Sequence, residues 1–153
     1  MLRLFKRKSA EFFSEKEKEK ILQAIQAAEK NTSGEVRVYV ESRCRFVDAV
    51  DRAIEIFGGL KMHETEQHNA ALVYVAMKDK QLAVFGDEGI YIKTGKEFWN
   101  TTVSNMIAQF NKENYADGIA DVVKKIGEAL EYHFPFDAST DKNELPDDIV
   151  FGK

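Results

Sequence analysis

The chain has 153 residues, 44% of them hydrophobic and 31% charged, which is the composition of a globular protein and enough length for one domain with a sizeable core. It carries 22 Lys and Arg against 26 Asp and Glu, a formal net charge of −4. An acidic balance argues against nucleic acid as a partner, because nucleic-acid-binding domains usually present a basic face. The one cysteine, Cys44, excludes a disulfide framework within the chain.

Residues 1–12 form a basic N-terminal segment in which apolar side chains alternate with four cations. Residues 9–11, Ser-Ala-Glu, stand where a secretory signal needs an apolar stretch, and nothing in the sequence approaches the ~20 apolar residues of a transmembrane helix. We therefore expect a cytoplasmic protein with no transmembrane segment. The basic segment is expected either to be a solvated terminus or to make weak contact with an anionic membrane surface.

Hydrophobic spacing predicts alternating helices and strands along most of the chain. A capping box, Ser14 with Glu17, starts the first helix, and the apolar run from Ala71 to Met77 is typical of a central strand. In chain order we expect a helix from Ser14 to about residue 30, a strand at 35–41, a helix at 46–57, strands at 70–77 and 82–85 joined as a hairpin, a short edge strand at 90–92, and helices at 99–110 and 119–130.

This order predicts an α/β protein, a three-layer α/β/α sandwich with helices on both faces of a small mixed sheet of about four strands. The domain is expected to span residues 13–134. Residues 135–153 contain both prolines, have little periodicity and are expected to form an acidic C-terminal tail, strapped to the body through residues 149–151.

Carboxylate and amide side chains follow or precede the predicted strands. If the strand at 35–41 runs parallel to the strand at 82–85, the end of the first strand, the start of the second and the end of the third lie at one edge. Open α/β sheets bind ligands at such edges, and oxygen donors suit Ca²⁺ or Mg²⁺. The alternative is that these are solvated loop residues. The candidate metal ligands are Glu41, Glu64, Glu66, His68, Asn69, Asp87 and Glu88.

Zn²⁺ is a less favoured ion. His63 and His68 are five residues apart, so they do not share a helix face as the histidines of an H-E-x-x-H motif do. A loop could still bring both imidazoles to one zinc ion with Glu64 or Glu66. The alternative is two exposed histidines.

Other catalytic and binding motifs are absent from the sequence. Cys44 lacks the arginine that a thiol-based phosphatase places six residues later, since position 50 is Val50. Residues 137–143 have the acidic spacing of an EF-hand loop, but Lys142 stands where that loop requires glycine. No P-loop or nucleophile elbow occurs.

From Phe13 to Glu131 the chain resembles the TPM domain family, which has thylakoid, photosystem-associated and nematode members. The resemblance rests on the order and spacing of several short signatures, which are the helix start at 14–20 and the segments at 32–36, 68–73, 84–89 and 110–119. Glu88 falls on the family's Gly-x-Glu-Gly motif. His68 stands where the family usually has aspartate, in Asp-Asn-Gly, so one acidic ligand is lost.

The resemblance implies an α/β/α sandwich, divalent-metal binding in some members and acid phosphatase activity in thylakoid members. We therefore expect a domain that binds Ca²⁺ or Mg²⁺ as a binding or regulatory module. One alternative is a metal-dependent phosphomonoesterase that uses the same site, for which only Arg43, Arg45 and residues 93–96 offer cations to a phosphate. The other is a metal-free interaction domain whose protein partner contacts the 61–69 loop or the tail.

Overall fold

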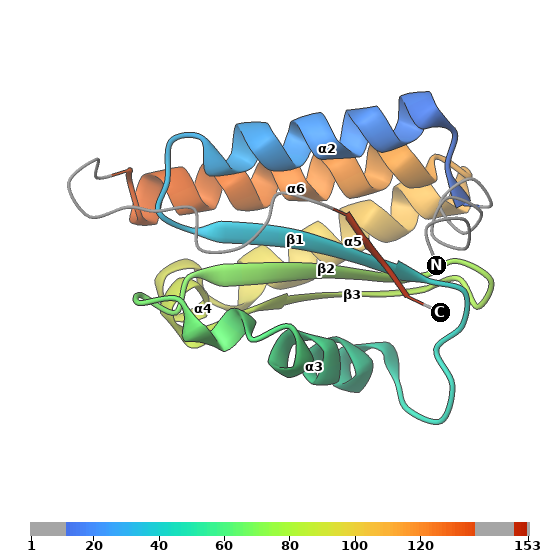
Figure 1. The fold of residues 1–153 in the computed structure, drawn as a ribbon, viewed down its shortest axis with the longest axis horizontal. Coiled ribbons are helices and arrows are strands. Elements are labelled where there is room, and N and C mark those ends of the chain that lie inside the picture. The colour runs from blue at the N-terminus through green and yellow to red at the C-terminus, as the bar shows by residue number, and fades with distance from the viewer. Residues whose placement is uncertain (1–11, 137–148, 153) are drawn as a thin grey trace.

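The computed structural model describes residues 12–136 and 149–152. The expected α/β/α sandwich is confirmed: α2, α5 and α6 cover one face of the sheet and α3 covers the other (Figure 1). Among the described residues, no helix is long and apolar enough to cross a membrane. The elements are α2 (Glu15–Glu29), β1 (Glu35–Glu41), α3 (Ala49–Gly59), the 3₁₀ turn η1 (Met62–Glu64), β2 (Ala70–Ala76), β3 (Gln81–Gly86), α4 (Glu88–Thr94), α5 (Lys96–Asn111), α6 (Tyr115–His133) and β4 (Ile149–Phe151).

The four strands are ordered β3-β2-β1-β4. β1 pairs in parallel with β2, from Glu35 opposite Ala70 to Glu41 opposite Ala76. β4 also runs parallel to β1, which confirms the expected strap at residues 149–151. β3 is antiparallel to β2 and so also to β1, which makes the assumption that the first and third strands are parallel wrong.

This strand polarity gives the sheet two distinct ends. The carboxyl ends of β1 and β2 meet at one end, beside the hairpin that leads into β3. The amino ends of the same strands meet the end of β3 at the opposite end, where α4 begins (Figure 1). Residues predicted to share one edge are therefore divided between two.

The alternation of side chains along the strands builds two cores, one on each face of the sheet. Val36, Val38 and Val40 of β1 face α2 and α6, while Leu72 and Tyr74 of β2 face α3. All seven residues of β2 are buried, because this central strand is covered on both faces. Its uninterrupted apolar sequence follows from that double burial.

The expectation of a short edge strand at 90–92 is wrong, because this segment belongs to helix α4. Asp87 caps this helix, with its Oδ1 accepting a hydrogen bond from the Glu88 amide at 2.9 Å. Ile90 is fully buried whereas Ile92 is largely exposed. Two isoleucines in alternation imitate a strand over three residues, and only the cap at Asp87 distinguishes the helix.

Helices α2 and α6 approach each other closely at a glycine. Gly127 of α6 lies against Ala28 of α2, and a Cβ added at Gly127 would lie 2.6 Å from the Cβ of Ala28. Glycine costs about 1 kcal/mol in a helix interior relative to alanine. That cost is accepted here because it allows the two helix backbones to approach closely.

We predict that Gly127→Ala lowers the free energy of unfolding by about 1–2 kcal/mol, because overlap with Ala28 exceeds the gain in helix propensity. Gly58→Ala is the matched control: it lies in α3 with nothing within 4 Å of an added Cβ, and should stabilise by about 0.5 kcal/mol. Urea denaturation measures both. A stabilised Gly127→Ala variant would contradict the close approach of α2 and α6.

Candidate functional site

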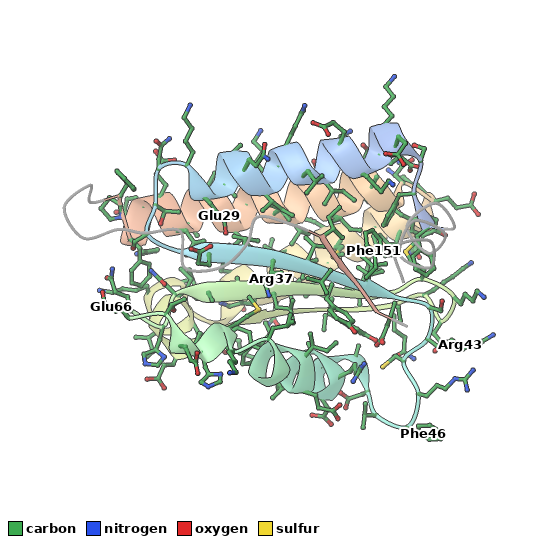
Figure 2. All side chains as sticks on the ribbon, viewed as in Figure 1. Glu29, Arg37, Arg43, Phe46, Glu66 and Phe151 are labelled. Carbon is green, nitrogen blue, oxygen red and sulfur yellow. The ribbon has the colours of Figure 1, made fainter. Side chains whose placement is uncertain are left out.

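The structure separates Glu41 from the other predicted ligands. Glu41 closes β1 at the carboxyl end of the sheet, whereas Asn69 and Asp87 flank β2 and β3 at the other end. A seven-residue strand places these ends about 20 Å apart. Figure 2 shows the same division, with Glu66 at one end of the molecule and Arg43 and Phe46 at the other.

His68 and Asp87 come together at the amino end of β2. His68 Nδ1 lies 3.1 Å from Asp87 Oδ2, and the two side chains are 49% and 14% exposed. The backbone fixes both groups, because the Asp87 amide donates to the Ala70 carbonyl and the Ile90 amide donates to the His68 carbonyl. One carboxylate oxygen of Asp87 thus accepts the capping hydrogen bond from the Glu88 amide, and the other contacts the His68 imidazole. The exposed side chain of Glu88 follows directly in the chain.

Asn69 follows His68 in the chain and is 1% exposed. Its Nδ2 donates to Ser33 Oγ at 3.1 Å, and its backbone amide donates to Thr65 Oγ1 at 3.2 Å. Its Oδ1 is buried and has no hydrogen-bond partner. A buried amide oxygen without a partner carries a desolvation penalty, and such groups in native proteins often mark the position of a water or an ion.

Gly89 brings backbone carbonyls to the same place. A Cβ at this position would overlap the carbonyl oxygens of Gln67 and His68, so only glycine lets the first turn of α4 lie against this segment. The two carbonyls therefore lie directly beside the residue that follows Glu88. Together with Asp87 and Asn69, they make the amino end of β2 rich in oxygen donors of the kind that Ca²⁺ and Mg²⁺ prefer.

The remaining candidates do not join this group. Glu64 ends η1, and Glu66 lies in the loop after it; both side chains are exposed, as is His63. Over residues 12–136 and 149–152, no three His, Cys, Asp or Glu side chains lie in a position to hold a metal ion together. The donors thus suit a hard cation chemically, but the side chains alone do not form a complete cage.

Three residues that support the site were missed by the sequence reasoning. Ser33 Oγ accepts from both Asn69 and Gln67, and Thr65 holds the Asn69 amide. The segment at 32–36 was noted as a family signature, and that signal could have placed Ser33 at the site. No sequence pattern indicates Thr65 or Gln67, because their contacts with Asn69 and Ser33 depend on how the 61–69 loop folds.

At the other end of the sheet, Glu41 is occupied by its own partners. Arg52 of α3 donates from Nε and Nη2 to its two carboxylate oxygens at 2.9 and 3.0 Å, and the Tyr74 hydroxyl also donates to it. The hydrogen bond to Glu41 raises the pKa of Arg52. Burial, and then the hydrogen bond to Glu41, raises the pKa of Tyr74. A carboxylate satisfied in this way joins α3 to the sheet and is not available as a ligand.

Fold and site together define a small α/β/α sandwich domain with a polar site at the amino end of its central strand. The sequence profile of the TPM domain matches residues 7–129, which is most of the chain. The chain belongs to the TPM domain family.

Solved structures agree with this assignment. The BA42 protein from the psychrophilic bacterium Bizionia argentinensis is 40% identical, with a TM-score of 0.83 over 92% of this chain and 96% of that one. The N-terminal domains of cg2496 from Corynebacterium glutamicum and of a P. gingivalis protein share the fold. They are 12% and 15% identical, have TM-scores of 0.63 and 0.65, and cover 88% and 80% of this chain and 80% and 79% of theirs. Comparison with curated proteins found no match.

The contacts of Glu41 predict a structural role that can be measured. Glu41→Gln should lower the free energy of unfolding by about 2 kcal/mol, because it removes the charge that Arg52 and Tyr74 bond to in a buried setting. Chemical denaturation at neutral pH measures the change. Glu55→Gln is the control, since this exposed carboxylate also contacts Arg52 and should matter by less than about 0.5 kcal/mol. Equal effects of the two substitutions would contradict the assignment.

Proposed function

We propose that this TPM domain is a divalent-cation-binding module that takes Ca²⁺ or Mg²⁺ at the amino end of β2. Asp87 and Glu88 supply carboxylates, Asn69 supplies its amide oxygen, and the carbonyl of Gln67 supplies a backbone donor. The observation that carries the proposal is the buried Oδ1 of Asn69, which has no hydrogen-bond partner and belongs to the residue that follows His68, the imidazole in contact with Asp87.

The donor count sets the expected affinity. Tight calcium sites use several carboxylates and six to eight oxygen ligands, whereas this site has two neighbouring carboxylates, one of them in contact with His68. Water would therefore complete much of the coordination. We expect a dissociation constant of the order of 0.1–1 mM, in the range of weakly binding calcium modules.

The arrangement favours cation binding over phosphoryl transfer. A phosphomonoesterase must hold the negative charge of its substrate with cations or backbone amides. Arg43 lies by the carboxyl ends of β1 and β2, where it pairs with Asp79, about a strand length from Asp87. Arg45 is on the same distant loop. Lys93 is in the last turn of α4 and Lys96 begins α5, so neither lysine is in the first turn of α4, which follows Asp87.

Isothermal titration calorimetry of chelator-stripped protein with Ca²⁺ and Mg²⁺ tests the proposal. We predict saturable binding that weakens more than about tenfold in an Asp87→Asn, Glu88→Gln variant. Asparagine at position 87 keeps the helix cap, so the variant should stay folded. Asp51→Asn is the matched control, because Asp51 lies in the first turn of α3 at the other end of the sheet.

A variant that should bind Ca²⁺ more tightly than the parent chain provides a second test. His68→Asp places a third carboxylate beside Asp87, and the left-handed backbone at residue 68 (φ 49°) is one that aspartate tolerates. This variant should bind Ca²⁺ about tenfold more tightly than the parent chain. Absence of saturable binding in both the parent and His68→Asp, or binding unaffected by the change at Asp87 and Glu88, would overturn the proposal.

A further inference from the structure

The loop between β1 and α3 presents an aromatic side chain entirely to solvent. Phe46 is 101% exposed and has a positive φ of 73°, a conformation uncommon for bulky residues. Figure 2 shows it at the outermost point of this loop, away from both cores. Neither exposure nor backbone conformation is explained by packing within the described part of the chain, so the side chain is presented at a cost.

The loop is held in place by the neighbouring hairpin. The Cys44 amide and the Arg43 guanidinium both donate to the carboxylate of Asp79, at 2.8 and 3.1 Å. The Lys78 amide donates to the Ser42 carbonyl, and Cys44 Sγ contacts the Val47 carbonyl at 3.3 Å. Residues 42–47 and 77–80 therefore form one preorganised surface, called here the Phe46 end.

The Phe46 end is cationic in a chain whose net charge is −4. Its residues include four cations, Arg43, Arg45, Lys78 and Lys80, against one carboxylate, Asp79, which the loop itself engages. The four cationic residues are all exposed. Beside them is an open cleft of about 690 Å³ that Arg45, Phe46, Val47 and Lys78 help to line. An apolar tip ringed by cations is complementary to a surface that is anionic outside and apolar beneath.

The basic N-terminal segment is attached to the same end of the molecule. Phe12 stacks on Phe151 with ring centroids 6.4 Å apart, and Phe151 pairs with Val40, one residue before the end of β1. The chain preceding Phe12 therefore starts next to the carboxyl end of β1. That stretch carries Arg3, Lys6, Arg7 and Lys8 with apolar residues between them. The described chain thus begins, at Phe12, at the same end of the domain as the loop, and a basic and apolar sequence precedes it.

We propose that the Phe46 end docks on an anionic lipid bilayer, with Phe46 inserted between headgroups and Arg43, Arg45, Lys78 and Lys80 against lipid phosphates and carboxylates. Each basic residue near such a surface contributes electrostatic attraction, and stable docking generally takes two signals. The loop is one signal and the N-terminal segment is the other. The membrane lies at the opposite end of the sheet from the cation site, so this docking does not depend on the proposed function.

An acidic protein surface is the competing partner. A fully exposed aromatic tip beside a cleft that is open and not enclosed fits a deformable bilayer interface better than a fixed pocket on a protein. The acidic residues of α3, Asp51 and Glu55, lie along the helix after the loop. The loop and the hairpin lie at the carboxyl end of the sheet (Figure 1), and Glu55, which lines the same cleft as Phe46, is paired with Arg52.

Co-sedimentation of the full chain with vesicles tests the proposal, in chelator so that no cation contributes. We expect binding to phosphatidylcholine vesicles that contain phosphatidylserine, and little binding to phosphatidylcholine alone. Phe46→Asn, which suits the positive φ, should weaken binding about tenfold. Arg45→Gln should weaken it about fivefold. Tyr132→Asn and Lys30→Gln are the matched controls, because both residues are exposed at the end of the molecule near the start of β1.

A fluorescence readout separates the loop from the N-terminal segment. The emission of Phe46→Trp should shift to the blue on phosphatidylserine vesicles, whereas that of Tyr132→Trp should not; the buried Trp99 is a constant background in both. No binding to anionic vesicles, or equal binding to neutral vesicles, would overturn the proposal. So would binding that Phe46→Asn leaves intact while the combined substitutions Arg3→Gln, Lys6→Gln, Arg7→Gln and Lys8→Gln abolish it. Absence of vesicle binding together with binding to an acidic polypeptide such as polyglutamate would overturn it in favour of a protein partner.

Discussion

The parallel pairing of β1 with β2 is the constraint on which the rest of the structure depends. It requires the chain to return to the start of the sheet after β1, and α3 makes that return across one face. It also aligns the carboxyl ends of both strands at one end of the molecule and their amino ends at the other. Glu41 therefore lies at one end and Asn69 and Asp87 at the other, so the direction of one strand pair decides which of these residues can act together.

The two ends differ in how they satisfy buried polar groups. At the carboxyl end, the Glu41 carboxylate accepts hydrogen bonds from Arg52 and Tyr74, and Arg52 neutralises its buried charge within the domain. At the amino end, Asn69 uses its amide nitrogen on Ser33 and leaves its buried oxygen without a partner. The first arrangement joins α3 to the sheet, while the second leaves an amide oxygen without a hydrogen-bond partner in the domain. For this reason the proposed cation site is at the amino end, although both ends contain carboxylates.

Much of the fold follows from local sequence signals. The valines of β1 alternate with polar residues, the run from Ala71 to Met77 is apolar throughout, and the Ser14 capping box starts α2; each of these expectations is confirmed. The segment at 90–92 was misread because Ile90 and Ile92 alternate like a strand, and the cap at Asp87 was treated as a strand end. A single capping residue is a weaker signal than two β-branched side chains, although here it decided the structure.

The site could be predicted only in part, for a geometric reason. Asn69 and Asp87 are expected at one edge and lie at the same end of the sheet, because β2 and β3 form a hairpin whose ends must meet. Glu41 was placed with them on the assumption that β1 runs parallel to β3, and sequence periodicity carries no information on strand direction. Ser33 and Thr65 contact Asn69 through loops whose paths no local pattern determines. The sequence thus shows which residues are available, and the topology shows which of them meet.

The most direct test of this account follows amide signals in two-dimensional NMR spectra while Ca²⁺ is added to the full chain. The account predicts shifts confined to the amino end of β2 and the start of α4, at residues 67–69 and 87–89, with Glu41 and the hairpin at 77–80 unchanged. Shifts centred on Glu41 and the hairpin would contradict it, because they would place the cation at the carboxyl end of the sheet, where the structure has already paired the carboxylate.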